Sequence, residues 1–174
     1  MDRQKILVVD DENRMRKLVK DFLQRENFEV LEAGDGSEAL DVFFAHQDIA
    51  LMILDVMMPD MSGFEVSQKL KADPEAAHIP IIFLTALNST ADIVKGFQVG
   101  GNDFISKPFN KEELIIRVSH QISLVAAKRI IEAKTEELKK TIIGRDKLYS
   151  VIAHDLRSPM GSIKMVLNML ILSL

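Results

Sequence analysis

The fold is decided by the stretch Ala50-Leu51-Met52-Ile53-Leu54-Asp55-Val56-Met57-Met58-Pro59-Asp60-Met61-Ser62-Gly63, an apolar run that ends at one carboxylate and then turns. Five apolar residues without polar alternation are typical of a strand buried on both faces, as in the centre of a parallel sheet. Asp55 would then lie at the carboxyl end of a central strand, where open α/β sheets bind their ligands. The alternative is that Asp55 only hydrogen-bonds its own turn, and this stretch alone leaves both interpretations open.

On both sides of this stretch, short apolar runs alternate with segments of helical character. The expected strands are Ile6–Val9, Phe28–Glu32, Ala50–Leu54, Ile79–Leu84 and Asn102–Ser106. The expected helices cover about 13–26, 36–46, 63–71 and 90–99, and a fifth begins near Asn110. Five strands and five helices in strict alternation predict an α/β fold with a doubly wound parallel sheet. Because the first, third and fourth runs are the most apolar, we expect these strands at its centre.

The composition limits the class of protein. With 174 residues, 47% of them apolar and 28% charged, the chain is expected to be a soluble globular protein of one domain with an extension, or of one large domain. The absence of cysteine excludes disulfides and thiolate metal sites. No signal region precedes the first apolar run, so a cytoplasmic location is the default expectation. Residues 1–120 carry 13 basic and 21 acidic side chains and residues 121–174 carry 9 and 5, which suggests two parts with different roles.

Polar side chains stand where four of the expected strands end. They are Asp10 and Asp11, Asp55, Thr85 and Lys107. Because the carboxyl ends of parallel strands share one edge of a sheet, we expect these side chains to converge. Three crowded carboxylates repel one another unless a hard cation lies among them, and Mg²⁺ is the expected ion. Each residue alone has another explanation, since Asp11 could cap a helix, Thr85 could simply end a strand and Lys107 could be a solvated loop lysine.

Taken together, residues 1–120 resemble a response-regulator receiver domain of two-component signalling, which has a flavodoxin-like fold. The matching residues are Val8-Val9-Asp10-Asp11-Glu12, Asp55 with Met58-Pro59-Asp60-Met61-Ser62-Gly63, Thr85-Ala86 and Lys107-Pro108-Phe109. The resemblance implies that Asp55 is the phosphoacceptor and that the Lys107–Pro108 peptide bond is cis. It implies Mg²⁺ as the cofactor, held by oxygens of Asp10 (through water), Asp11, Asp55 and Met57 (main-chain carbonyl). It further implies that Thr85 and Lys107 contact the phosphoryl group and that Phe104 rotates as Thr85 moves.

The segment after this region is expected to be one long helix. Residues 110–158 contain no proline and one glycine, Gly144, and 49 helical residues would span about 73 Å. Steps of four and three trace an imperfect apolar seam through Leu124, Lys128, Ile131, Thr135, Leu138, Ile142, Arg145, Tyr149, Ile152 and Leu156. We therefore expect a parallel homodimer through residues 121–174, with residues 121–148 as a coiled-coil signalling helix. The alternative is a solvated linker helix that folds back on its own domain.

A second constellation lies in residues 149–174. The string His154-Asp155-Leu156-Arg157-Ser158-Pro159 resembles the phosphoacceptor box in the dimerisation domain of sensor histidine kinases. A histidine on a helix is by itself more often a surface residue, but neutral imidazole is nucleophilic at pH 7. The resemblance implies His154 as a phosphoacceptor and Asp155 as its general base. After Pro159 we expect an amphipathic helix that is too short and too polar to span a bilayer.

The resemblance to a kinase is incomplete. No asparagine box or glycine-rich lid follows, and the glycines beyond residue 120 are Gly144 and Gly161, so we expect neither ATP binding nor phosphorylation of His154 in cis. The chain is then expected to be either the N-terminal piece of a longer kinase or a truncated dimeric regulator that acts by protein contact.

The function we expect is phosphorelay signalling. Asp55 would take a phosphoryl group from a histidine kinase or a histidine phosphotransfer protein, and the helical dimer would transmit this state toward His154. A metal-dependent phosphohydrolase is a weaker candidate, because Met57 stands where a second acid would be needed. A transcription factor is also weaker, because residues 121–174 show no basic, turn-broken helical unit for reading DNA. We expect no nucleic-acid or membrane partner.

Overall fold

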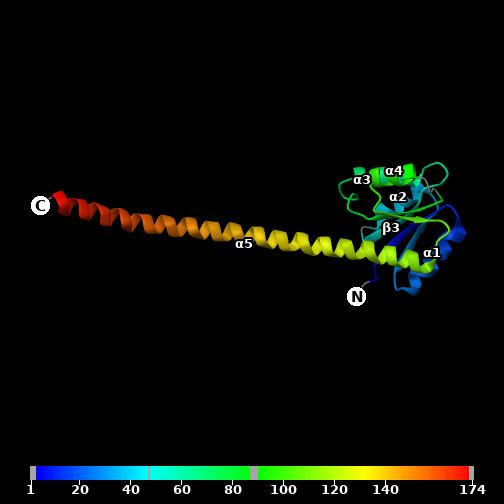
Figure 1. The fold of residues 1–174 in the computed structure, drawn as a ribbon, viewed down its shortest axis with the longest axis horizontal. Helices are drawn as coiled ribbons and strands as arrows, with labels where there is room; N and C mark the ends of the chain where they lie inside the picture. The colour runs from blue at the N-terminus through cyan, green and yellow to red at the C-terminus, as the bar shows by residue number, and fades with distance from the viewer. Residues whose placement is uncertain (1–2, 47, 87–89, 173–174) are drawn as a thin grey trace. The chain divides into compact units, whose positions relative to one another are not determined.

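The computed structural model describes residues 3–46, 48–86 and 90–172, with side chains described as far as residue 155 (Figure 1). Five parallel strands form one sheet in the order β2-β1-β3-β4-β5. The strands are β1 (Lys5–Val9), β2 (Glu29–Ala33), β3 (Ile49–Asp55), β4 (Ile81–Thr85) and β5 (Asp103–Ser106). The helices are α1 (Asn13–Arg25), α2 (Gly36–Ala45), α3 (Gly63–Ala72), α4 (Thr90–Gln98) and α5 (Lys111–Leu172). The expected α/β fold is confirmed, and β1, β3 and β4 are the inner strands.

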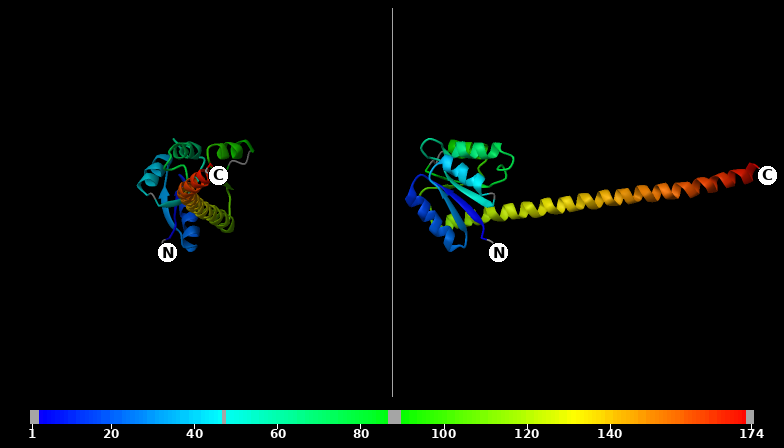
Figure 2. Two further views of the ribbon diagram at one scale, coloured as in Figure 1. Left: turned by 90° about the vertical axis from the view of Figure 1, so that its left-hand side faces the viewer. Right: turned by 180° about the vertical axis from the view of Figure 1, so that it is seen from behind.

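Helices cover both faces of the sheet (Figures 1 and 2). On one face α1 and the first turns of α5 pack against side chains that include Ile53 and Leu84. On the other face α2 and α3 pack against side chains that include Leu54 and Phe83. Successive side chains of a strand point to opposite faces, so neighbours such as Ile53 and Leu54 join different halves of the core. The unbroken apolar run of β3 is explained by this two-sided burial.

The turn after β3 is held by a cap and by one glycine. The Ser62 Oγ accepts a hydrogen bond from the Glu65 amide at 3.4 Å, and the Ser62 amide donates to Glu65 Oε2 at 2.9 Å, which together form a capping box at the start of α3. A Cβ on Gly63 would overlap the Asp55 carbonyl oxygen and lie 2.9 Å from its carbon. Only glycine lets α3 begin this close to the end of β3. The capped turn thereby fixes the main chain of Asp55.

The chain divides into two structural units, Met1–Ala126 and Ala127–Leu174. The first unit contains the sheet, and the second consists of the continuation of α5, in which residues 127–155 are all exposed. The helix α5 is continuous through Pro159 as far as Leu172. A proline removes one main-chain donor, and the turns on either side keep their own hydrogen bonds. Among the described residues, no helix has the length and apolarity needed to cross a membrane.

Candidate functional site

Four neighbouring strands bring polar side chains to one edge of the sheet. Asp10 follows β1, Asp55 ends β3, Thr85 ends β4 and Lys107 follows β5. Since these strands adjoin in the order β1-β3-β4-β5, their carboxyl ends form one continuous edge. Asp10, Asp55 and Thr85 are buried, whereas Asp11 is exposed to solvent. This strand-end site (Asp10, Asp11, Asp55, Thr85 and Lys107) is therefore closed from below by the core and open toward solvent at Asp11.

Lys107 joins the two buried carboxylates of the site. Its Nζ lies 2.7 Å from Asp10 Oδ2 and 2.9 Å from Asp55 Oδ2. The other oxygen of each carboxylate accepts a main-chain hydrogen bond, from the Glu12 amide to Asp10 at 2.8 Å and from the Met57 amide to Asp55 at 3.2 Å. Each carboxylate is thus held at both oxygens. Such double anchoring fixes the direction in which the free lone pairs of Asp55 point.

The main chain around Lys107 explains how its side chain reaches the site. The Lys107 amide donates to the Thr85 carbonyl at 2.8 Å, which continues the pairing of β4 with β5 by one residue. The peptide bond between Lys107 and Pro108 is cis, as the family resemblance implied. Sequence reasoning missed Arg16, whose Nη1 donates to the Asp10 carbonyl at 2.6 Å. A basic residue one turn into the helix that follows an acidic pair is the signal that could have identified it.

Burial and charge act against each other at this site. Removal from water raises the pKa of Asp55 above its usual range, and the neighbouring Asp10 charge raises it further, while Lys107 and the Met57 amide lower it only in part. For Lys107 burial lowers the pKa, but the hydrogen bonds and charges of Asp10 and Asp55 outweigh it, so the pKa rises. Lys107 is therefore a permanent cation at neutral pH. It supplies a positive charge between two adjacent carboxylates.

The same edge has the oxygen donors of a metal site. One carboxylate oxygen from each of Asp10, Asp11 and Asp55 lies within 4.8 Å of the others. Three carboxylates with a single lysine leave a negative balance, and hard oxygen donors suit Mg²⁺. Mg²⁺ gives up its bound waters reluctantly. Because Asp11 is exposed to solvent, it could bind an ion that keeps several of its waters. The residues present therefore fit the magnesium ion that the sequence predicted.

Phe104 lies on the same sheet face as Thr85, one strand away. Phe104 pairs in register with Phe83, and Thr85 pairs with Ser106, so both side chains project toward the face that α3 covers. The Phe104 ring is tilted against Phe83 with centroids 5.3 Å apart, and it meets Phe97 of α4 edge-on at 5.0 Å. The predicted pair of Thr85 and Phe104 is thus placed on one surface of the sheet, next to α4.

His154 and Asp155 lie in the second unit, on the exposed part of α5. The His154 Nδ1 is 3.5 Å from Asp155 Oδ1, and the two side chains are 85% and 73% exposed. A histidine in this setting is accessible to a partner protein. Its neighbouring carboxylate is close enough to orient the ring.

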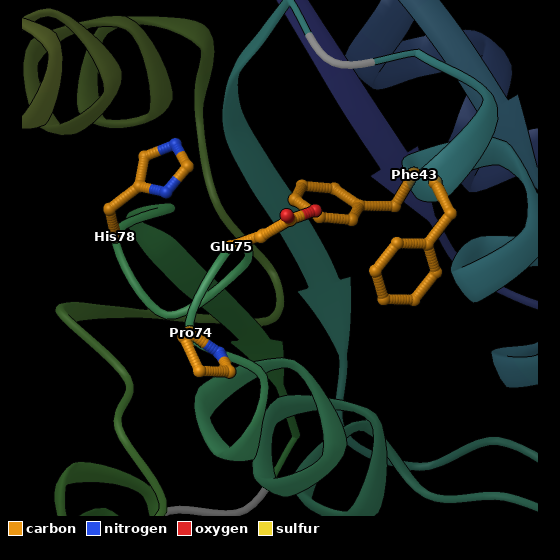
Figure 3. Close-up of a pocket in the computed structure, with 5 residues that line it drawn as sticks. Phe43, Pro74, Glu75 and His78 are labelled. Carbon is orange, nitrogen blue, oxygen red and sulfur yellow. The ribbon is translucent and has the colours of Figure 1, made fainter.

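A hollow lies at the other end of the strands from the strand-end site, near the amino ends of β3 and β4. It has a volume of about 540 Å³ and is lined by Phe43, Phe44, Pro74, Glu75 and His78. Figure 3 shows the Glu75 side chain extending from the connection before β4 toward the phenylalanine rings of α2. No residue of the strand-end site lines it, so it is not part of that site.

A model of the response regulator receiver domain matches residues 6–119, which include every residue of the strand-end site. The chain belongs to the response regulator receiver family. Receiver domains of this family accept phosphoryl groups from histidine kinases, and they typically bind Mg²⁺ at an acidic cluster such as the one formed here by Asp10, Asp11 and Asp55.

Known proteins resemble this receiver domain in sequence and in structure. The transcriptional regulatory protein SrrA of Staphylococcus aureus is 43% identical over 113 residues, which cover 65% of this chain and 45% of SrrA. The chain thus matches less than half the length of this relative. The chemotaxis response regulator CheY4 of Vibrio cholerae superimposes with a TM-score of 0.66 at 33% identity, over 69% of this chain and 99% of CheY4. The signal receiver domain of a histidine kinase from Syntrophus aciditrophicus gives 0.64 at 32% identity, over 69% and 90% of the two chains.

Proposed function

We propose that the receiver domain takes a phosphoryl group on Asp55 and that residues 121–174 transmit this state as a helical dimer. The observation that carries the first half is the position of Lys107, within 2.9 Å of Asp55 and 2.7 Å of Asp10. A buried carboxylate at a strand end, with a cation on one side and two further carboxylates on the other, is equipped to accept a phosphoryl group. A turn aspartate would need none of these partners.

In the proposed reaction, a carboxylate oxygen of Asp55 attacks the phosphorus of a phosphohistidine. The new bond is O–P, the N–P bond breaks, and the imidazole nitrogen keeps the electron pair and takes a proton from solvent. Lys107 would shift from the carboxylates to a phosphoryl oxygen, and the Thr85 hydroxyl would donate to another. A bound Mg²⁺ would offset the negative charge that accumulates on the phosphoryl oxygens.

The proposed metal ligands are the side chains of Asp11 and Asp55 and the main-chain carbonyl of Met57, with Asp10 acting through water. The clustered oxygens of the three aspartates support this set. The proposed response to phosphorylation is a coupled movement of Thr85 and Phe104, supported by their position on one sheet face. The donor would be a histidine kinase or a histidine phosphotransfer protein.

The test is to incubate the chain with Mg²⁺ and a small phosphoryl donor such as acetyl phosphate and to measure its intact mass. One added phosphoryl group is expected, and Asp55→Asn should abolish it. Asp41→Asn, which changes an exposed aspartate of α2, is the matched control and should be phosphorylated as the parent is. Equal labelling of the parent and of Asp55→Asn would refute the proposal.

The helical dimer is supported by the apolar side chains that α5 exposes from residue 124 onward. Leu124, Ile131, Leu138 and Ile152 are each 43–65% exposed and recur at intervals of seven residues or a multiple of seven. A helix with such a seam is stabilised when a second copy covers it. The +4 charge of residues 121–174 is spread along the segment, so it does not oppose pairing strongly.

Leu138→Glu places a charge in this seam, and Lys140→Glu places the same charge two residues away on the outer side of the helix. Sedimentation equilibrium should show a dimer for the parent and for Lys140→Glu, and a monomer for Leu138→Glu. A monomeric parent would support the alternative of a solvated linker helix.

For His154 we propose a phosphoacceptor role that depends on an external ATP-binding domain, with Asp155 as the general base. The exposed ring and its 3.5 Å contact with Asp155 support this proposal. With such a domain and ATP supplied, the chain should gain an acid-labile, base-stable phosphate that His154→Gln removes and His120→Gln, at an exposed position of α5, leaves in place. If no such phosphate forms, the remaining proposal is a dimeric regulator that acts by protein contact only.

A further inference from the structure

Gly96 is the buried residue of α4, and it lies against the ring of Phe104. A Cβ built on Gly96 would overlap the Phe104 Cζ and lie 2.7 Å from its Cε1. The optimal separation of two non-bonded carbon atoms is about 3.5–4.0 Å. The edge of the ring is therefore in contact with the main chain of α4 at the one position of the helix where no side chain keeps it away.

The contact belongs to a connected row of aromatic rings. Phe64, which follows Gly63 at the start of α3, meets Phe83 with centroids 5.2 Å apart, and Phe83 meets Phe104 at 5.3 Å. Phe104 in turn meets Phe97, which is 51% exposed on α4. The row therefore runs from the turn that fixes Asp55 to the outer surface of α4. Phe104 lies between Phe83 and Phe97 in this row.

Phe83 is held more firmly than Phe104. It is fully buried, and a Cβ on Gly101 would overlap its Cε2 and lie 2.7 Å from its Cδ2. The Gly101 amide donates to the Gly96 carbonyl at 2.9 Å, so the two glycines are parts of one closed turn. Phe104 is only half-buried, so part of the residue is exposed to solvent. When it is displaced from Gly96, it can move outward or along the sheet face toward the end of β4, where Thr85 lies.

We propose that Gly96 is a positioning residue for the phosphoryl-accepting site. Its bare main chain holds the Phe104 ring against α4 in the unphosphorylated chain, and the ring leaves this position when Asp55 carries a phosphoryl group. The proposal rests on the proposed function of Asp55 and on the coupled movement of Thr85 and Phe104. It adds the element that favours the unphosphorylated arrangement, namely the absence of a side chain at position 96.

Gly96→Ala tests this because the methyl group would occupy the place of the ring edge in the unphosphorylated arrangement only. Phosphorylation by acetyl phosphate with Mg²⁺ should become faster by at least about fivefold, which is the lower end of the equilibrium shifts that overpacking produces. Gly144→Ala is the matched control, since a Cβ there meets nothing within 4 Å, and its rate should equal that of the parent. An unchanged or slower rate in Gly96→Ala would overturn the proposal.

The same substitution in a Phe104→Ala background separates the contact from any general effect on α4. Without the ring, Gly96→Ala should leave the phosphorylation rate unchanged. An acceleration that persists in this background would show that Gly96 acts through something other than Phe104, and the proposal would be wrong.

A second readout needs no phosphorylation. It is the unfolding free energy of the parent, of Gly96→Ala, of Phe104→Ala and of the double variant. The two substitutions should be strongly non-additive, with the double variant more stable than the sum of the single effects predicts. If the two effects on the unfolding free energy were additive, the inferred contact between Gly96 and the Phe104 ring would be wrong. If the parent takes no phosphoryl group, the proposed function of Asp55 has failed, and this cycle still decides whether Gly96 positions Phe104.

Discussion

Replacement of Lys107 by methionine would remove the charge between Asp10 and Asp55 while keeping a side chain of similar length. The side chains of Asp10 and Asp55 are 1% and 6% exposed, and each has Lys107 as its ion-pair partner at less than 3 Å. The substitution therefore leaves two adjacent buried carboxylates without a cation. We expect the folded chain to lose stability, and to lose it in a way that a divalent cation repairs.

The size of the loss follows from burial. Removing one partner of a buried ion pair costs about 3–5 kcal/mol. Lys107 is 19% exposed, so water screens part of this cost, and protonation of Asp55, whose pKa is already raised by burial, relieves another part. We expect the unfolding free energy at pH 7, without divalent cation, to fall by about 2–3 kcal/mol. Saturating Mg²⁺ should reduce the loss, because the ion binds the folded cluster and not the unfolded chain.

Native-state hydrogen exchange of the β3 amides measures this free energy in the sheet without contribution from the exposed part of α5. Lys5→Met is the matched control, because Lys5 pairs with Asp48 at 2.6 Å but Asp48 is 63% exposed. Its effect should be much smaller, since exposed pairs contribute little. Equal losses in the two variants, or a loss at Lys107 that Mg²⁺ does not reduce, would refute the reasoning.

Three further predictions concern the turn and the metal site. Asp11→Asn should weaken Mg²⁺ binding by at least about tenfold in calorimetric titration. Its thermal stability without metal should stay nearly unchanged, because Asp11 is exposed and carries no buried contact. Equal Mg²⁺ affinity in the parent and the variant would show that Asp11 is not a metal ligand. Gly63→Ala should destabilise the domain by about 2 kcal/mol or more through overlap with the Asp55 carbonyl, whereas Gly144→Ala should not, as urea unfolding would show. Ser62→Ala should cost about 1 kcal/mol through loss of the capping box, and Ser62→Asp, which keeps a capping oxygen, should recover most of it.

The sheet could be predicted from the sequence because burial on two faces leaves a direct mark on it. Ile53 and Leu54 project to opposite sides, so both must be apolar, and the run that contains them identifies a central strand. Convergence of the strand ends then follows from parallel topology alone, which is why the order of residues along the chain is enough to group Asp10, Asp55 and Lys107.

Contacts between non-adjacent segments could not be predicted in this way. That one lysine bridges both carboxylates, and that Gly63 and Gly96 are required by the close approach of Asp55 and Phe104, depends on distances that no residue pattern records. The continuity of α5 at Pro159 is likewise not decided by the residue pattern. A proline is locally unfavourable in a helix, but a long helix with intact turns on both sides can continue through it, as α5 does at Pro159.

The contact of Lys107 with both carboxylates also bears on how the chain folds during synthesis. Lys107 and Asp10 are separated by 97 residues, and the three aspartates all precede the lysine in the chain. During synthesis from the N-terminus, β1 and β3 emerge with their carboxylates long before β5 brings the compensating charge. Until β5 is added, the carboxylates at the ends of β1 and β3 lack the Lys107 charge that lies between them in the complete structure. Under the proposed function, phosphorylation of Asp55 would therefore require the completed sheet, because Lys107 reaches Asp55 only when β5 is in place.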